Sequence, residues 1–426
     1  MRGPRPFRIF LMVILALTPL SQAFWFVWSW QVVGALPWTA PRLLFQGLWA
    51  AAALVVLAAG IELLVGPVVP RRAFGPWWRA GARLWLIASC IGFLGVIVVG
   101  SIGWLTLVGM ALLPAAEAAR VEPARRTVCR YATYLAGGIP LLATAYGATV
   151  GRRRYRLVTV EVPVPDLPAS LDGLRIVHLS DLHIGDFMSR AGIRRAVALA
   201  NAAQPDLAVL TGDLITSERD PLEDCIEELS RLRAPLGVWG CHGNHERWAG
   251  VENRAQTLFT RYGMHMLRQQ CVVLSWHGGS FNLIGVDDQR ERGRPGEPSS
   301  LLHEIESLVR KDMPNILLSH HPDTFPSAAA LGIELTLAGH THGGQFRVAL
   351  GDRQWSAASL VTPFAAGLYC LPLGHERRAE GVTAGHRKPA FLYVNRGLGT
   401  FGLPVRLGVP PEITLHILRK PRSGTC

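Results

Sequence analysis

The feature that most constrains this chain is a set of four long stretches without a charged residue, all within the first 156 positions. Each is close to or longer than the about 20 apolar residues that a helix needs to cross a bilayer. A soluble domain could not bury four such helices in so short a segment, because almost no surface would remain to face water. We therefore expect about four transmembrane helices, over Ile9–Pro41, Leu43–Ile61, Leu84–Ala116 and Tyr131–Gly151.

Charge and histidine divide the chain into two parts. Sixteen Arg against three acidic residues give residues 1–156 a formal charge of +13, which leaves −1 for residues 157–426. All 14 His lie at or beyond His178. The sequence thus predicts an all-α membrane region over 1–156 and a domain that carries the chemistry over 157–426. Because the positive charge belongs to the membrane region, it does not indicate nucleic-acid binding, and we expect no nucleic-acid partner.

The arginines also predict an orientation. With the N-terminus inside, the inner segments hold 11 Arg and the outer loops hold 5. Cytoplasmic loops are enriched in Arg and Lys, so we expect a multi-pass protein of the cell (inner) membrane with its second domain in the cytoplasm. Alternatively, Met1–Ala23 is a signal peptide cleaved after Ser21-Gln22-Ala23, which would leave the later spans oriented as before. Seven Cys without a CxxC pair suggest neither a disulfide framework nor a thiolate zinc site.

From Leu174 onward, short apolar runs alternate with stretches of helical periodicity. This alternation is typical of an α/β sandwich whose strands are buried on both faces. The Pro-containing segment Val160–Pro168 is expected to form an edge strand. Further strands are expected over Leu174–Ser180, Asp206–Thr211, Gly237–Cys241, Cys271–Leu274, Phe281–Val286, Ile316–Ser319 and Leu335–Ala338, and helices over Arg190–Ala203, Cys225–Leu232, Glu252–Tyr262 and Leu301–Val309.

Polar residues follow five of the expected strands. Each segment alone could be an ordinary turn or helix cap. Together they would bring carboxylates, an amide and imidazoles to the sheet edge where strand ends converge. Desolvating these groups without a cation would cost several kcal/mol. The five segments are Ser180-Asp181-Leu182-His183, Gly212-Asp213, Gly243-Asn244-His245-Glu246, His320-His321-Pro322 and Gly339-His340-Thr341-His342-Gly343-Gly344-Gln345.

A pair of divalent ions bridged by a carboxylate, about 3.5–4 Å apart, would compensate these groups. Oxygen and imidazole ligands without thiolates suit Mn²⁺, Fe or Zn²⁺. The sequence therefore predicts two divalent metal ions as cofactors.

The motifs DxH, GD, GNHE, HHP and GHTHGGQ resemble those of the calcineurin-like metallophosphoesterases. Tyr393–Thr414 (YVNRGLGTFGLPVRLGVPPEIT) is similar to the end of a membrane-attached bacterial branch of that family, which includes the YkuE and YaeI proteins. The resemblance covers about Val158–Leu418. It implies a calcineurin-like β-sandwich flanked by helices, with four layers in the order α/β/β/α, after the transmembrane region.

The resemblance also implies a role for each motif residue. Asp213 would bridge the two ions, and His245 would protonate the leaving oxygen or stabilise charge on the phosphoryl oxygens. Metal-bound hydroxide would then attack the phosphorus in line. Asp181, His183 and His342 would hold one ion, and Asn244, His320 and His340 the other.

Four further residues have roles that the motifs alone do not assign. His321 could replace His320 as a ligand or contact the substrate. Arg396 is a candidate for binding the substrate phosphate, because guanidinium matches phosphate geometry bidentately. Glu246 is expected behind the ligands, and His178 in the core.

We thus expect a membrane-anchored dinuclear phosphohydrolase that cleaves a phosphate ester or anhydride. Four spans are more anchoring than a soluble metabolite requires, which favours a lipid or lipid-linked substrate. One specific alternative is an enzyme like UDP-diacylglucosamine pyrophosphatase. Another is a membrane sensor or scaffold that uses the fold without turnover. The near absence of ionisable residues in the spans argues against a transport path.

Overall fold

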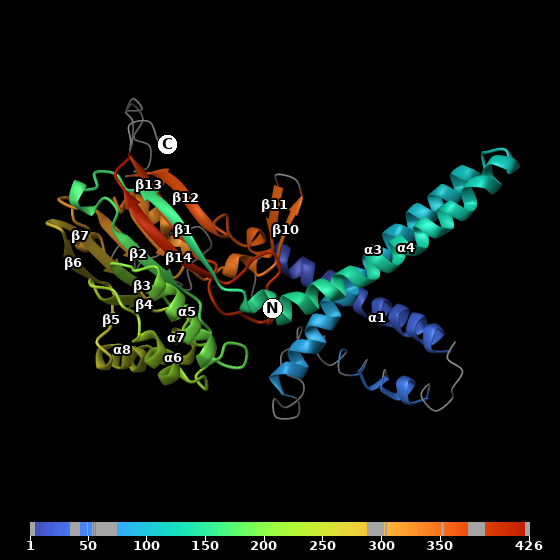
Figure 1. The fold of residues 1–426 in the computed structure, drawn as a ribbon, viewed down its shortest axis with the longest axis horizontal. Helices are drawn as coiled ribbons and strands as arrows, with labels where there is room; N and C mark the ends of the chain where they lie inside the picture. The colour runs from blue at the N-terminus through green and yellow to red at the C-terminus, as the bar shows by residue number, and fades with distance from the viewer. Residues whose placement is uncertain are drawn as a thin grey trace. The chain divides into compact units, whose positions relative to one another are not determined.

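The computed structural model describes residues 5–34, most of 43–56, 75–287, 302, 305–350, 353–373 and 388–421. The chain folds as two compact units, Met1–Thr149 and Val150–Cys426 (Figure 1).

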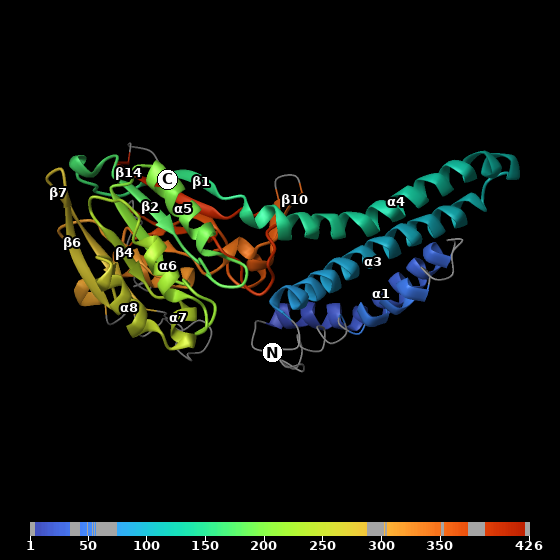
Figure 2. The same ribbon diagram turned by 60° about the horizontal axis from the view of Figure 1, so that its bottom comes forward.

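The first unit is helical, and its described helices are α1 (Arg5–Gly34), α3 (Pro76–Met110) and α4 (Ala115–Thr149). Helices α3 and α4 run side by side, joined by a short turn (Figures 1 and 2). Small residues allow close packing here: a Cβ added at Gly137 of α4 would lie 2.8 Å from the Trp25 ring of α1. The Trp25 indole also donates a hydrogen bond of 3.0 Å to the Ser89 carbonyl of α3. Such contacts are typical of helices that pack in membranes.

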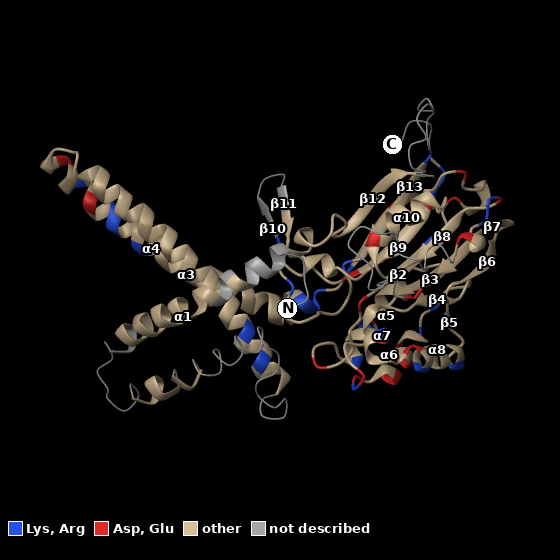
Figure 3. Cartoon of the chain, turned by 180° about the vertical axis from the view of Figure 1, so that it is seen from behind, with Lys and Arg blue, Asp and Glu red and all other residues tan. Residues whose placement is uncertain are grey.

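Among the described residues, α3 has the length and apolar composition to cross a bilayer. It corresponds to the expected span Leu84–Ala116, but begins and ends several residues earlier. The expected span Tyr131–Gly151 falls in the second half of α4, whose first half carries the charged residues seen as blue and red bands in Figure 3. The expected span Leu43–Ile61 lies partly outside the described residues. A four-span region therefore stays a prediction.

The second unit is built on two six-stranded sheets. The first sheet has the order β1 (Arg156–Pro163), β14 (Glu412–Arg419), β2 (Arg175–Leu179), β3 (Leu207–Thr211), β4 (Val238–Cys241) and β5 (His265–Met266). The second has the order β12 (Gly367–Pro372), β13 (Pro389–Val394), β9 (Leu335–Ala338), β8 (Asn315–Leu318), β7 (Gly279–Gly285) and β6 (Gln270–Trp276). In the first sheet β14 is parallel to β1 and antiparallel to β2, and the strands from β2 to β5 are parallel. In the second, β6 and β12 are antiparallel to their neighbours and the other pairs are parallel.

Alternating side chains of the central strands fill two separate cores. On β2, Ile176 packs in the core that also holds Leu283 and Ile316 of the second sheet. The next residue, Val177, packs in the core formed with the helices of the first sheet. Strands buried on both faces explain the continuous apolar runs in the sequence. The helices on the first sheet are α5 (Arg190–Ala202), α6 (Leu222–Leu229), α7 (Asn244–Ala249) and α8 (Glu252–Arg261), and α10 (Phe325–Ala330) packs on the second.

The mixed α/β fold with helices on both sheets confirms the expected fold class. The expected strands agree with the observed ones to within a few residues, and the edge strand β1 starts at Arg156, four residues before its expected start. Of the helix expected over Leu301–Val309, the described part holds a 3₁₀ turn at Glu306–Leu308. The hairpin β10 (Arg347–Leu350) and β11 (Arg353–Ser356) was not expected.

Candidate metal centre

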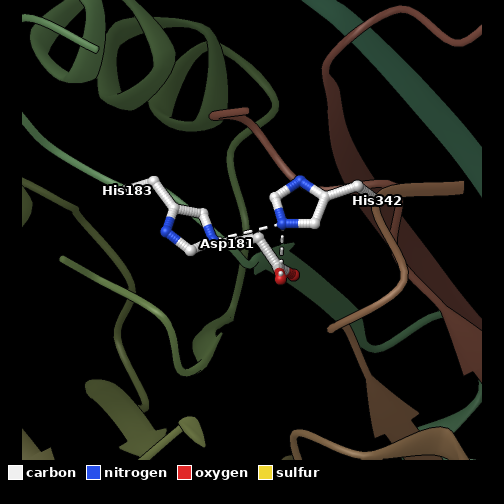
Figure 4. A group of neighbouring side chains, drawn as sticks. All are labelled: Asp181, His183 and His342. Atoms are coloured by element: carbon white, nitrogen blue, oxygen red, sulfur yellow. Dashed lines mark hydrogen bonds and ion pairs between the residues drawn. The ribbon is translucent and has the colours of Figure 1, made fainter. Parts of the chain in front are cut away.

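Three of the predicted ligands, from the loops after β2 and β9, converge on one point. The His183 and His342 Nε2 atoms lie 3.1 Å apart, and His342 Nε2 lies 3.3 Å from Asp181 Oδ1. Figure 4 shows the two imidazoles and the carboxylate pointing toward one another. All three side chains are buried, so their donor atoms form a preformed set for one cation.

A second set of donor atoms lies beside the first and shares Asp213 with it. The Asp213 Oδ2 atom is 3.5 Å from His183 Nε2 and 3.2 Å from His320 Nε2. The His320 Nε2 atom is in turn 3.2 Å from His340 Nδ1. Asp213 therefore stands between the two sets, where a bridging carboxylate would lie.

The hydrogen bonds around these residues test whether a cation fits. The Asn244 Oδ1 atom is buried and has no hydrogen-bond partner among the described residues, which is costly unless a cation is bound. The His320 Nδ1 atom lies 2.6 Å from the Thr211 carbonyl and so must carry the proton of a neutral ring. In that neutral ring, the Nε2 lone pair would face the Asp213 carboxylate. Two acceptor groups that face each other, His320 Nε2 and the Asp213 carboxylate, fit a divalent metal ion between them, with Asn244 Oδ1 as a further ligand.

Five of the predicted ligands have left-handed backbones, which is unusual for residues other than glycine. Each such residue costs about 1–3 kcal/mol and persists only where its surroundings fix it. Backbone strain in the residues that carry the donor atoms indicates a site shaped for binding rather than for stability. The φ angles are 51° for Asp181, 47° for His183, 54° for Asp213, 70° for His340 and 51° for His342.

Two glycines of the motifs leave room for the carboxylates. A Cβ added at Gly339 would lie 2.3 Å from Asp181 Oδ2, and one added at Gly243 would lie 2.2 Å from Asp213 Oδ1. A residue larger than glycine at either position would have to displace the carboxylate. Glycine is therefore required before His340 and before Asn244, because a side chain at either position would collide with a carboxylate.

Comparison with known proteins agrees with this geometry. Residues 174–344 match the family described as calcineurin-like phosphoesterase. The phosphodiesterase YaeI of Escherichia coli is 30% identical over 247 residues, which cover 57% of this chain and 80% of YaeI. The chain belongs to the calcineurin-like phosphoesterase family.

Two further relatives extend the comparison. The metallophosphoesterase YkuE of Bacillus subtilis is 29% identical over 289 residues, covering 67% of this chain and 93% of YkuE. A bovine transmembrane protein with a metallophosphoesterase domain is 34% identical over 274 residues, covering 62% of this chain. The matched regions span 57% of that bovine protein and 63% of its zebrafish counterpart.

Burial and mutual attraction shift the pKa values of the side chains in this site strongly. Burial raises the pKa of Asp181 to about 6 and lowers that of His183 to about 3. Burial would also lower the pKa of His320, but the Asp213 carboxylate outweighs it and raises that pKa to about 10. His320 in turn holds the pKa of Asp213 well below its usual range, against the effect of burial. Both shifts have the same physical cause, the attraction between the Asp213 carboxylate and the His320 ring, whose Oδ2 and Nε2 atoms lie 3.2 Å apart.

Glu246 supports the site from behind. Its carboxylate accepts hydrogen bonds from the backbone N–H groups of Asp213 (2.9 Å), Leu214 (2.7 Å) and Gly243 (2.8 Å). Burial raises its pKa to about 7. Through these hydrogen bonds Glu246 connects the loop after β3 to the loop after β4. Its carboxylate lies behind the predicted ligands.

His245 is held so that one ring nitrogen is left for chemistry. Its backbone N–H donates to Asp213 Oδ1 at 2.9 Å, and its Nδ1 lies 2.8 Å from the Thr216 carbonyl. The Nδ1–H is therefore fixed, and Nε2 is the atom free to exchange a proton. One of its ring nitrogens lies within 4.8 Å of donor atoms of both His183 and Asp213.

The remaining sequence candidates lie close by in different settings. His321 is buried, with its ring centroid 3.9 Å from that of His340. The Arg396 guanidinium forms an ion pair of 3.3 Å with Glu412. His178 lies in the core, 2.8 Å from Thr211 Oγ1.

Arg406, which is 1% exposed and lies behind His342, was not predicted from the sequence. Its Nη2 is 2.6 Å from the Gly399 carbonyl and 3.3 Å from His342 Nδ1. It belongs to the segment Tyr393–Thr414, but nothing in that pattern signals its burial.

Proposed function

We propose that the protein is a membrane-attached phosphohydrolase that uses two divalent metal ions to cleave a phosphate ester or anhydride. The observation that supports this most directly is the place of the Asp213 Oδ2 atom, 3.5 Å from His183 Nε2 and 3.2 Å from His320 Nε2. Bound divalent ions supply charge that binds phosphate oxygens and lowers the pKa of water. One would be held by Asp181, His183 and His342, the other by Asn244, His320 and His340, with Asp213 between them.

His245 completes the chemistry. With Nδ1–H fixed by the Thr216 carbonyl, its Nε2 takes up a proton and donates it to the leaving oxygen. Family membership and the phosphodiesterase name of YaeI support a hydrolase of phosphate esters. A scaffold without turnover is less well supported, because all seven ligand positions and His245 are filled.

The substrate we propose is a lipid or lipid-linked phosphate. The Trp248 and Phe401 rings lie 4.7 Å and 4.8 Å from the His245 ring, centroid to centroid. They are nevertheless 61% and 47% exposed, so an apolar group beside the leaving oxygen could cover them. An apolar rim suits an acyl or prenyl chain better than a small polar metabolite. A pyrophosphatase acting on UDP-diacylglucosamine would be one enzyme of this class.

The activity can be tested with the full-length protein in detergent, loaded with Mn²⁺, on bis(p-nitrophenyl) phosphate. We expect Asp213→Asn and His245→Ala each to lower kcat by about 10²–10⁴-fold. Asp213→Asn should also lower the bound metal measured by elemental analysis, whereas His245→Ala should not. Asp312→Asn is the matched control, because this carboxylate is exposed and pairs with Arg310. Full activity of Asp213→Asn would contradict the proposed function.

The membrane part of the proposal needs its own test. Arginine placement supports a cytoplasmic catalytic domain in a multi-pass protein. A phosphatase reporter fused after Cys426 should therefore be inactive, and a cytoplasmic fluorescent reporter active. Activity of the phosphatase fusion in the periplasm would overturn the orientation.

A further inference from the structure

A cavity of about 230 Å³ lies next to the candidate metal centre. It is formed by the turn after His342, the hairpin β10–β11, β12 and the loop after β13. A water molecule takes up about 30 Å³ of liquid, so the cavity has room for several waters or for a phosphate group. Its polar and turn residues are Gly343, Arg347, Ser356, Ser359, Tyr369 and Arg396.

Two arginines, Arg347 and Arg396, line this cavity. The Arg396 charge is partly balanced by Glu412, at 3.3 Å. Arg347 forms no ion pair with a carboxylate in the part of the chain that the structure describes. Burial and the charge of Arg396 both lower the pKa of Arg347. Two like charges that share a cavity repel each other, and a bound anion would relieve that repulsion.

Hydroxyl groups add directional donors. The Ser356 and Ser359 Oγ atoms lie 3.2 Å apart, so one of the two hydroxyls has its hydrogen free for a ligand. The Tyr369 hydroxyl already donates to the Ala366 carbonyl and is not available in the same way. Two guanidiniums and a serine hydroxyl match the acceptor oxygens of a phosphate group.

The cavity and the metal centre share a wall. Gly343 directly follows the ligand His342, and a Cβ added at Gly343 would lie 3.4 Å from Arg396 Cγ and 2.9 Å from Val409 Cγ1. The turn that carries the metal ligand thus packs against Arg396. One molecule could reach both places.

We propose that this cavity binds a second phosphate group of the substrate, one that is not cleaved. The inference rests on the proposed function and narrows it to substrates with two phosphate groups, such as bisphosphates or substituted pyrophosphates. Arg347 and Arg396 would bind the second group while the first lies at the metal centre.

Binding can be measured without catalysis. Full-length protein treated with a chelator is reacted with phenylglyoxal, which modifies guanidinium groups, with and without inorganic phosphate, and the modified sites are mapped by mass spectrometry. We expect phosphate to lower the modification of Arg347 at least fivefold. Arg310, which pairs with Asp312 at the surface, is the matched control and should react equally in both samples. Equal modification of Arg347 with and without phosphate would overturn the proposal.

Kinetics then separate a substrate subsite from a site for free phosphate. Two probes suffice: the p-nitrophenyl ester of thymidine 5′-phosphate, and the same ester with a second phosphate on the 3′ oxygen. We expect wild type to prefer the bisphosphate in kcat/KM, and Arg347→Gln to lower that preference at least tenfold, whereas Arg310→Gln keeps it. Phosphate protection without any preference would mean that the cavity binds free anions, and the proposal would fail. If wild type cleaves neither probe, the proposed function fails, and the modification experiment still reports on the cavity.

Discussion

At the scale of single residues, the metal centre is a place where a proton and a cation compete. The Asp213 carboxylate, 3.2 Å away, raises the pKa of His320 to about 10. A metal ligand must be neutral, so a proton on this ring would have to leave before an ion binds. Burial already keeps His183 neutral, with its pKa lowered to about 3. We therefore expect His320 to be the ligand that loses a proton when a metal ion binds.

This exchange predicts that metal binding releases protons. Since Asp213 raises the pKa of His320 to about 10, Mn²⁺ binding at pH 7 should release about one proton from this residue. Metal affinity should rise with pH over the range between 7 and 10. Titration calorimetry in buffers of different ionisation enthalpy measures the number released. His320→Gln should bind metal more weakly and with less proton release, and an unchanged proton count in that variant would contradict the assignment.

A second residue-scale prediction concerns Arg406. Its guanidinium donates to the Gly399 carbonyl from both Nε (2.9 Å) and Nη2 (2.6 Å), and all of it is buried. Arg406→Met would leave that carbonyl without these donors and would remove the charge behind His342. We expect a loss of about 1–3 kcal/mol in the free energy of unfolding, measured in urea. Arg310→Met, at an exposed ion pair, should cost less than about 1 kcal/mol.

At the scale of elements, the site is made by five strand ends that point to one place. Local patterns were sufficient to predict the five motif-bearing strands, because each is a short apolar run followed by polar residues. Strand β14 was not predicted, since its place between β1 and β2 depends on pairing across more than 230 residues. Arg347 and Arg406 were missed for a related reason: their surroundings come from distant segments, and nothing in their own neighbourhood marks them as buried or lining a cavity.

The turn after β9 gives a prediction at this scale. Gly339→Ala would place a Cβ 1.9 Å from Ser180 Oγ and 2.3 Å from Asp181 Oδ2, so the loops after β2 and β9 must separate. We expect the bound metal to fall from about two ions per chain to one or fewer, measured by elemental analysis. The control is Gly332→Ala, where an added Cβ meets no atom within 4 Å and the left-handed backbone, at φ +89°, is strained instead. Equal metal loss in both variants would point to general destabilisation and not to the turn.

At the scale of the whole molecule, the chemistry and the apolar helices belong to separate units. The predicted metal ligands and the cavity beside them all lie between residues 181 and 409, inside the unit Val150–Cys426. This division explains why composition averaged over the chain describes neither part. It also suggests that the catalytic unit can fold without the helices, provided that its own first residues are retained.

Contacts made by the first residues of the catalytic unit allow its N-terminal boundary to be tested. Arg152 donates a hydrogen bond of 2.6 Å to the Phe187 carbonyl, and Tyr155 packs on the first-sheet core with its hydroxyl 3.3 Å from Met188 Sδ. A fragment that starts at Leu157 lacks both, whereas one that starts at Val150 keeps them. Burial of one aromatic side chain contributes about 1.5–3 kcal/mol, which corresponds to at least about 3 °C in Tm for a unit of this size. We therefore expect the longer fragment to melt higher while both hydrolyse bis(p-nitrophenyl) phosphate. If the two fragments melted at the same temperature, Arg152 and Tyr155 would contribute nothing to the catalytic unit.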